Sequence, residues 1–222
     1  MIKIKQIVLL SILNLLFACS DTGNANIDHA KNNKQLNKLQ TQKTTTQLKD
    51  INIIDIQPYE GLSDEIVNYI YFELKKVYPK VNLLKVKDLP KRAYYKPRNR
   101  YRADTIIALQ RDITLDGHVT MGLTHKDIST DNGAIYDWGI MGLAFNSGKA
   151  GVASTFRVSK TKTKEQYFKV VIHELGHTQG LDHCPDITCL MTDAKGKNTT
   201  DGEKGFCKKC KAHLINRGWK LK

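Results

Sequence analysis

The chain has 222 residues, 41% hydrophobic and 26% charged, as expected of a soluble globular protein with one domain of ordinary size. Its formal net charge of +13 would suit a nucleic acid or an anionic surface as partner. The basic residues are spread along the chain, however, and no nucleic-acid-binding motif occurs. We therefore expect a solvated basic face and no nucleic-acid partner.

The first segment, residues 1–18, has the pattern of a signal peptide. Lys3 and Lys5 precede an apolar run, Ile7–Phe17, that is too short for a comfortable membrane span. The ending "LFAC" resembles a bacterial lipoprotein signal, in which Cys19 receives lipid and becomes the mature N-terminus. This resemblance implies an extracytoplasmic protein on a lipid anchor in the bacterial cell envelope. The alternative is an ordinary secretory peptide and a secreted protein.

The second segment, residues 19–49, is predicted to be the lipidated cysteine and a flexible polar tether. From Ser20 to Lys49 the chain is rich in Asn, Lys, Gln, Thr and Asp and has no aromatic residue. Such a composition buries too little apolar surface to offset the entropy lost on ordering. The third segment, residues 50–222, is then the single folded domain, which we expect to be a monomer.

Strands and helices alternate at the start of this domain. The apolar run "INIIDIQP" (51–58) predicts a buried strand ended by proline. Ser63 can cap a helix whose apolar residues recur at helical spacing until Pro79 stops it. The alternating stretch at 81–90 predicts a second strand, and the stretch at 100–111 a second helix.

Three short runs rich in β-branched or aromatic residues follow and are predicted strands. They are 118–128, 136–145 and 151–158. A long helix then begins near Thr163, which can cap it with Gln166 in a capping box. A last helix covers residues 202–216. This order predicts an α/β domain of mixed α+β character, with one twisted mixed sheet of about five strands backed by helices.

The long helix carries the first candidate metal ligands. His173 and His177 are four residues apart, so two imidazoles lie on one face and can reach one zinc ion. Glu174 is rotated by about a hundred degrees, so it is a poor ligand but can take a proton from a water on the metal. Gly180 can end the helix in a left-handed conformation, and His183 can supply a third nitrogen. The complete H-E-x-x-H-x-x-G-x-x-H pattern favours a catalytic zinc over surface histidines.

Four cysteines follow this pattern in the sequence. Cys184 comes directly after the third histidine, Cys189 follows before Met191, and Cys207 and Cys210 form "CKKC" farther on. With the histidine pattern, this ordered set resembles the archaemetzincin family of metzincin-type zinc peptidases. The resemblance implies a single metzincin-like domain with an active-site helix and a C-terminal helix.

The resemblance extends over residues 51–219 and implies a role for each motif residue. Three histidines hold a catalytic zinc, a glutamate is the general base or acid, four cysteines hold a structural zinc, and a methionine lies in the Met-turn beneath the catalytic zinc. In that order, these residues are His173, His177 and His183; Glu174; Cys184, Cys189, Cys207 and Cys210; and Met191. A strand within 135–146 would line the cleft and pair with the substrate backbone.

The cysteine count agrees with two zinc ions. The five cysteines divide into one for lipid and four for a closed, structural zinc site. Disulfides are the alternative in a secreted chain, although the short spacings suit chelation better. Because His183 and Cys184 are neighbours, the two metals must be close, and the structural zinc would hold the third catalytic ligand in place.

Other polar residues carry weaker signals. His118, His125 and Asp127 lie near predicted strand ends, and His213 lies on the last helix. We expect surface or hydrogen-bonding roles for all four, since the metal sites are already full. Arg157 can orient a substrate or the long helix, and its position in the sequence does not distinguish these two roles.

The sequence therefore predicts a zinc-dependent peptidase that acts on peptide or protein substrates and is attached to a membrane through a lipid anchor. Aminopeptidase and endopeptidase activity both remain open. One alternative is a catalytically weak, zinc-stabilised binding lipoprotein, against which the presence of Glu174 and of every ligand argues. Another is adhesion to acidic polymers or lipid headgroups, for which the sequence offers only net charge.

Overall fold

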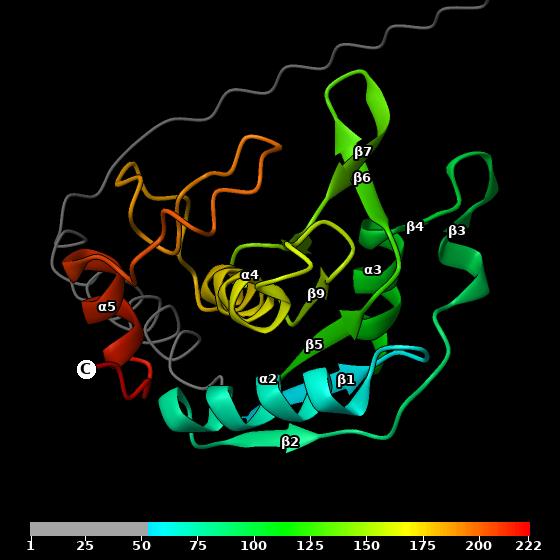
Figure 1. The fold of residues 1–222 in the computed structure, drawn as a ribbon. Coiled ribbons are helices and arrows are strands. Elements are labelled where there is room, and N and C mark those ends of the chain that lie inside the picture. The colour runs from blue at the N-terminus through cyan, green and yellow to red at the C-terminus, as the bar shows by residue number, and fades with distance from the viewer. Residues whose placement is uncertain (1–52) are drawn as a thin grey trace, which may run out of the picture. The chain divides into compact units, whose positions relative to one another are not determined.

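The computed structural model describes residues 53–222, so the predicted signal peptide, Cys19 and the tether lie outside the described residues. Figure 1 shows the arrangement of the elements. In chain order they are β1 (Ile53–Pro58), α2 (Asp64–Val77), β2 (Val81–Leu83), η1 (Lys91–Ala93), β3 (Tyr94–Tyr95), η2 (Lys96–Arg98), β4 (Arg100–Arg102), α3 (Ala103–Ile113), β5 (His118–Thr124), β6 (Ile128–Asn132), β7 (Ile135–Ile140), β8 (Gly142–Ala144), β9 (Ala150–Ser154), α4 (Thr163–Thr178) and α5 (Lys208–Ile215).

A five-stranded mixed sheet in the order β2-β1-β5-β9-β8 forms the centre of the domain (Figure 1). Neighbours from β2 to β9 pair in parallel, and β8 pairs antiparallel with β9 at the edge. Parallel strands need crossover connections; α2 lies between β1 and β2 and α3 between β2 and β5, whereas β5 is connected to β9 through β6, β7 and β8. The sheet therefore confirms the predicted mixed architecture of about five strands.

Helices cover both faces of this sheet. Leu74 of α2 and Leu175 of α4 share a core with Ala153 of β9. Ile106 of α3 shares a separate core with Val152, the preceding residue of β9. Successive side chains of a strand point to opposite faces, so α2 and α4 lie on one face and α3 on the other.

The start of α2 follows its sequence signal. The Ser63 side chain accepts a hydrogen bond from the Ile66 amide at 3.4 Å, and two acidic residues occupy the first turn. The helix ends at Val77, two residues before Pro79. The predicted helix is confirmed at both ends.

A second, smaller sheet, β3-β4-β6-β7, was not predicted. Two of the predicted strands each divide, 118–128 into β5 and β6 and 136–145 into β7 and β8. The β6–β7 hairpin projects from the body of the domain (Figure 1). Residues 100–102 form β4 instead of a first helical turn, because they pair with β6 and the Arg102 side chain bonds Asp131.

The capping box predicted for the long helix is wrong. The Thr163 hydroxyl donates to the Ser159 carbonyl at 2.8 Å, and Lys162 occupies the N-cap position. The Gln166 side chain instead accepts from the Ser159 amide at 2.7 Å. Both side chains therefore fasten the preceding loop to the helix and leave the cap position without a side-chain bond.

Three predicted segments are shorter than expected. The strand at 81–90 keeps only β2, the one at 151–158 ends at Ser154, and the helix at 202–216 begins at Lys208. In the last case the Gly205 carbonyl accepts from the Leu190 amide, which holds this stretch as a loop. Within residues 53–222, no helix has the length and apolar character needed to cross a membrane.

Candidate active site and metal centres

The predicted pair of helical histidines lies on one face of α4. Their Nε2 atoms are 3.1 Å apart. The Nδ1 atom of His173 lies 2.6 Å from the Leu190 carbonyl, and that of His177 lies 2.8 Å from the Leu181 carbonyl. A carbonyl only accepts, so each Nδ1 carries the proton and each Nε2 keeps its lone pair.

Two facing lone pairs at this separation repel each other unless a cation lies between them. Two nitrogens bound to one tetrahedral zinc are separated by about 3.4 Å, close to the observed spacing. Burial and the neighbouring imidazole lower the pKa of His173 to about 4, and burial lowers the pKa of His177. Both rings are therefore neutral, as metal ligands must be.

The third histidine reaches the pair because α4 ends abruptly. Gly180 has a φ of +89°, and its amide donates to the His177 carbonyl at 2.8 Å. The Leu181 amide donates to the Gly176 carbonyl at 3.0 Å, which completes a Schellman turn. The chain reverses, and the His183 ring centroid lies 4.8 Å from that of His177. One nitrogen from each of the three histidines lies within 4.8 Å of the others.

Glu174 lies beside the free edge of the five-stranded sheet. A Cβ atom on Gly142 of β8 would come within 2.5 Å of its Oε1. The carboxyl can lie against this edge because residue 142 has no side chain. Burial raises the pKa of Glu174 to about 8, although a hydrogen bond from the Ala144 backbone opposes the shift. A carboxyl with a pKa near neutrality is suited to moving a proton.

Met191 lies directly under the histidine helix. It is fully buried, and a Cβ atom on Gly176 would come within 2.4 Å of its sulfur. The absent side chain at Gly176 therefore lets the turn that contains Met191 touch the helix backbone between the two ligands. This position agrees with the Met-turn that the sequence predicts.

The four predicted cysteines form a second cluster. Cys184, Cys189, Cys207 and Cys210 are all free thiols, and their sulfurs lie within 4.8 Å of one another. The sulfurs of Cys184 and Cys207 are 3.7 Å apart. Tetrahedral zinc with Zn–S bonds of about 2.3 Å separates its sulfurs by about 3.8 Å, whereas a disulfide requires about 2.05 Å. The spacing fits a metal and not a disulfide.

Hydrogen bonds prepare these sulfurs for a cation. The Met191 amide donates to the Cys189 sulfur at 3.4 Å, and the Cys207 amide donates to the same sulfur at 3.3 Å. A backbone hydrogen bond from Cys210 lowers the pKa of Cys207 to about 7, while burial raises the pKa of Cys210. A bound cation would favour the thiolate of both.

Residues 184–191 connect the two clusters. The Cys184 amide donates to the Met191 carbonyl at 2.7 Å, which closes this segment into a loop. Cys189 belongs to the thiol cluster, and the next residue, Leu190, provides the carbonyl that orients His173. The sequence predicted a link only through the adjacent His183 and Cys184; the link through Leu190 was missed, because a backbone carbonyl leaves no sequence signal.

A cleft of about 1210 Å³ contains the three histidines and Glu174. One wall is the edge of β7 and β8, and the other is the loop at 192–205. Trp138 of β7 contacts this loop, since a Cβ atom on Gly196 would come within 2.5 Å of its ring. The walls therefore touch at one end of the cleft.

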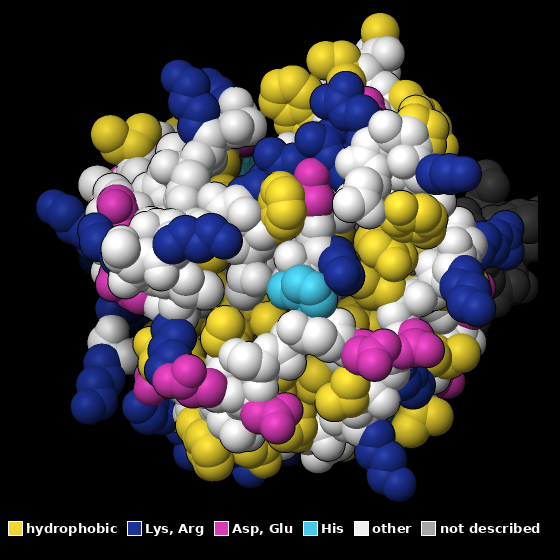
Figure 2. Space-filling model, turned by 45° about the vertical axis from the view of Figure 1, so that its right-hand side comes forward, with side chains coloured by type: hydrophobic (Ala, Val, Ile, Leu, Met, Phe, Trp, Pro, Cys, Tyr) yellow, Lys and Arg dark blue, Asp and Glu magenta, His cyan; other side chains and the backbone are white. Residues whose placement is uncertain are grey.

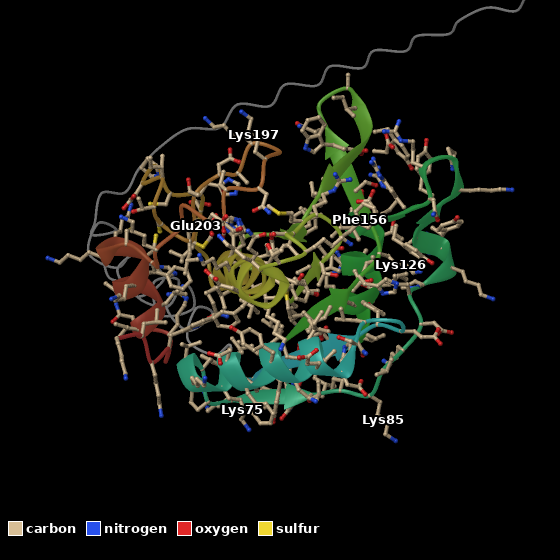
Figure 3. All side chains as sticks on the ribbon, viewed as in Figure 1. Lys75, Lys85, Lys126, Phe156, Lys197 and Glu203 are labelled. Carbon is tan, nitrogen blue, oxygen red and sulfur yellow. The ribbon has the colours of Figure 1, made fainter. Side chains whose placement is uncertain are left out.

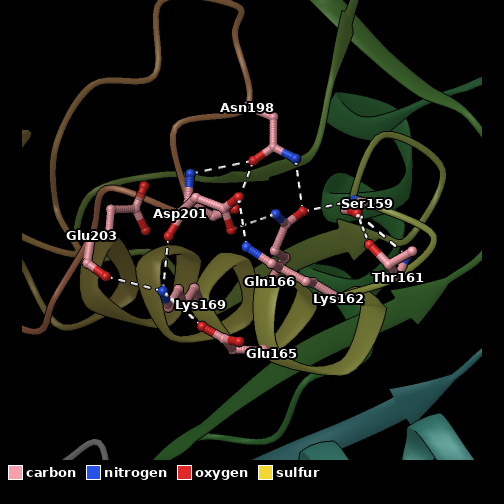
Figure 4. Close-up of polar contacts among 10 residues, drawn as sticks. Ser159, Thr161, Lys162, Glu165, Gln166, Lys169, Asn198, Asp201 and Glu203 are labelled. Atoms are coloured by element: carbon pink, nitrogen blue, oxygen red, sulfur yellow. Dashed lines mark hydrogen bonds and ion pairs between the residues drawn. The ribbon is translucent and has the colours of Figure 1, made fainter.

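Polar contacts fasten the 192–205 loop to the first half of α4 (Figure 4). The buried Gln166 side chain donates to Asp201 at 2.9 Å and accepts from Asn198 at 2.8 Å. The Lys169 ammonium donates to the carbonyls of Thr200 and Glu203 at 2.8 and 3.0 Å. Lys197 lies toward the outer end of this loop, and Glu203 lies near α4 (Figure 3).

The weaker candidates lie outside both clusters. His118 bonds Asp55 at 2.6 Å and His213 bonds the Gln179 carbonyl at 2.9 Å, which are hydrogen-bonding roles as expected. Asp127 receives hydrogen bonds from Arg100 and Arg157. Of this group only Arg157 lines the cleft.

The chain also matches the model of a known protein family. The model of peptidase family M54 matches residues 48–217. The chain belongs to peptidase family M54. The family predicted from the sequence and the enzyme class, a metallopeptidase, are thereby confirmed.

The similar proteins are archaemetzincins. That of Haloquadratum walsbyi is 28% identical over 172 residues, 71% of this chain and 96% of the relative. That of Methanopyrus kandleri is 32% identical over 136 residues, 60% of this chain and 75% of the relative. The crystal structure of archaemetzincin from Archaeoglobus fulgidus superposes with a TM-score of 0.63 at 28% identity, covering 73% of this chain and 99% of that one. These likenesses confirm the mixed α/β fold.

Proposed function

We propose that this archaemetzincin is a zinc-dependent peptidase with two zinc sites. His173, His177 and His183 hold the catalytic zinc, and the four cysteines hold a structural one. The observation that carries the proposal is the pair of Nε2 lone pairs 3.1 Å apart, each fixed by a carbonyl on the other ring nitrogen. Imidazole and thiolate ligands are those that zinc prefers in proteins.

Glu174 is the proposed general base and acid. Zinc bound by the three imidazoles would supply a positive charge that polarises a peptide carbonyl, strengthens water as a nucleophile and lowers the pKa of this carboxyl. As a carboxylate, Glu174 takes a proton from the attacking water and then gives it to the leaving amine. Its position against Gly142 keeps the carboxylate at the edge of the cleft, where the peptide bond lies.

The edge strand β8 is the proposed substrate platform. It pairs with β9 on one side only, and residues 142–144 line the cleft on the other. An extended peptide can add itself to such an edge through backbone hydrogen bonds, which places its bonds beside the metal regardless of side-chain sequence. Peptides and flexible protein segments are therefore the proposed substrates, cut internally or near an end.

The second zinc has a structural role in this proposal. Two of its cysteines are buried and the four thiolates leave no open position for a substrate. Through Cys189 the site fixes Leu190 and Met191, and thereby the orientation of His173. The competing function, a catalytically weak binding protein, would not need a glutamate held against the sheet edge.

The cellular setting is also a proposal. The signal-like segment at 1–18 and the following Cys19 support attachment to a membrane by lipid, outside the cytoplasm. A Cys19→Ala chain should then move from the membrane fraction to the soluble fraction when expressed in a bacterium. An unchanged distribution would contradict the anchor and leave the peptidase untouched. We further propose a monomer that does not bind nucleic acid.

The test of the peptidase uses the zinc-loaded full chain and a mixed peptide library read by mass spectrometry. The parent should cleave, and Glu174→Gln should reduce the rate by at least about 10²-fold, as expected for loss of a general base. Glu73→Gln, on the outer helix α2, is the matched control and should cleave like the parent. A parent with both metals bound that cuts nothing, or a Glu174→Gln chain that cuts equally well, would refute the proposal. The product ends distinguish aminopeptidase from endopeptidase.

A further inference from the structure

The residues that line the cleft include one arginine, beside Lys169, Lys195 and Lys197. Arg157 lines the same cleft as the three histidines. Its Nη2 donates to both oxygens of Asp127, at 2.8 and 3.0 Å. Its Nε is buried and has no partner, and no described residue accepts a hydrogen bond from its Nη1. Because Nε is buried and Nη2 is held by Asp127, Nη1 is the group of this guanidinium that can bind a further acceptor.

The carboxylate that holds Arg157 is shared with a second arginine. Asp127 also accepts from Arg100 at 2.6 Å, and Arg100 and Arg98 share Asp137. Arg157 therefore shares the single charge of Asp127 with Arg100, and its own charge is only partly neutralised. Lys and Arg side chains also gather at the upper part of the face in Figure 2, at the height of the β6–β7 hairpin.

Arg157 is placed by the backbone of β7. A Cβ atom on Gly139 would come within 2.0 Å of its Nη2, so the guanidinium lies against the strand at the one residue without a side chain. Gly142, three residues farther on, lies against Glu174. Three residues of extended chain span at most about 10 Å. A group bound by Arg157 would therefore lie within about three residues of the bond that water attacks beside Glu174.

We propose that Arg157 is a specificity-determining residue that binds a carboxylate of the substrate, a role that rests on the proposed peptidase function. Planar guanidinium groups match carboxylates in geometry and charge. The contact between Trp138 and Gly196 narrows the cleft next to Gly139. A chain terminus fits such a narrowing better than a continuing chain, so the α-carboxylate is the favoured source, and an acidic side chain is the other.

Binding tests this proposal without catalysis. Peptides of equal sequence that end in a carboxylate or in a carboxamide are titrated into zinc-loaded Glu174→Gln chain, followed by fluorescence anisotropy. The carboxylate form should bind at least about tenfold more tightly. A second series replaces Gln by Glu at each position of carboxamide peptides. A preference in the first series assigns the α-carboxylate, and a preference only in the second assigns an acidic side chain.

Added substitutions connect the preference to Arg157. Arg157→Gln should bring the ratio of the two affinities to within about twofold of unity, while the carboxamide peptide binds as before. Gly139→Ala keeps the charge but displaces the guanidinium, and should lower the ratio as well. Arg98→Gln removes an exposed charge from the same cluster outside the cleft and should keep the ratio. Equal binding of both peptides by the parent, or equal weakening of both by Arg157→Gln, would overturn the proposal.

Cleavage by the chain with intact Glu174 is measured separately. Cleavage without any carboxylate preference would refute the role of Arg157 alone. A binding preference without any cleavage would refute the peptidase and leave the carboxylate site in place.

Discussion

The two clusters of candidate metal-ligating side chains are connected by one loop, residues 184–191, and differ in almost every physical respect. The histidine cluster opens into a cleft, its rings are partly exposed, and an ionisable carboxyl lies beside it. The thiol cluster is half buried, has four ligands and borders apolar core residues. An open site with three ligands leaves room for chemistry, whereas a closed one can only stabilise. Residues 184–191 make the first site depend on the second.

The largest difference should appear when each cluster loses one ligand. Cys210→Ser should remove the structural zinc and lower the free energy of unfolding by about 5 kcal/mol or more, since binding of structural zinc is itself folding free energy. His177→Ala should remove the other zinc and all activity, with a much smaller loss of stability. Zinc content by mass spectrometry and urea denaturation measure both. Equal stability losses for the two variants would contradict the division of roles.

The buried carboxyl should give the metal-free protein an unusual pH dependence. The pKa of Glu174 rises from its ordinary value near 4.5 to about 8 on folding, so between these values the folded state holds a proton that the unfolded state has lost. Stability should therefore fall as pH rises from about 4.5 to 8, by up to about 4 kcal/mol. In metal-free Glu174→Gln this fall should disappear, as thermal unfolding at pH 5 and pH 8 would show. Bound zinc should suppress it in the parent, and an identical slope in parent and variant would contradict the assignment.

The contact between helix and Met-turn should be less costly to disturb. Gly176→Ala places a methyl group where the Met191 sulfur lies, and overpacking of this kind typically costs about 1–3 kcal/mol. Because Gly176 lies between His173 and His177, activity should fall more than stability. A Gly176→Ala, Met191→Ala double variant should recover part of the activity if steric conflict is the cause. The absence of any loss in Gly176→Ala would show that the turn is free to move away.

The smallest effect is expected at the loop that belongs to neither cluster. Asp201 forms an exposed ion pair with Lys162 at 3.0 Å, and such pairs contribute less than about 1 kcal/mol. Asp201→Asn removes the charge but keeps an oxygen for the Gln166 amide. The equilibrium constant of unfolding and kcat/KM should each change by less than about twofold. A large loss would mean that charge, and not the buried Gln166, anchors the cleft wall.

Local signals predicted the parts of this molecule that local physics decides. The helix from Ser63 to Val77 and the turn at Gly180 follow from capping and backbone preferences of single residues. The proximity of His173 and His177 follows from helical spacing, and that of His183 from the turn that ends the helix. The thiol cluster was predictable only through a family resemblance, since the distance between Cys189 and Cys207 along the chain says nothing of their proximity.

What the sequence could not predict depends on partners far along the chain. The small sheet consists of strands of two to six residues, and the pairing that holds it together, β4 with β6, joins segments far apart in the sequence. The sequence predicted Thr163 as the helix cap, but its hydroxyl donates to the Ser159 carbonyl. Gly142 and Gly176 are not fixed positions of any motif. They matter because the Glu174 carboxyl and the Met191 sulfur lie where their side chains would be.

The order of the elements also sets a sequence of events during synthesis. Every strand of the five-stranded sheet lies between residues 53 and 154, whereas the seven proposed ligands lie between residues 173 and 210. A growing chain can pair its strands before any ligand has been made, and domains commonly begin to fold from the N-terminal side. Metal acquisition is then the closing step of maturation, and it takes place wherever the last fifty residues first meet free zinc.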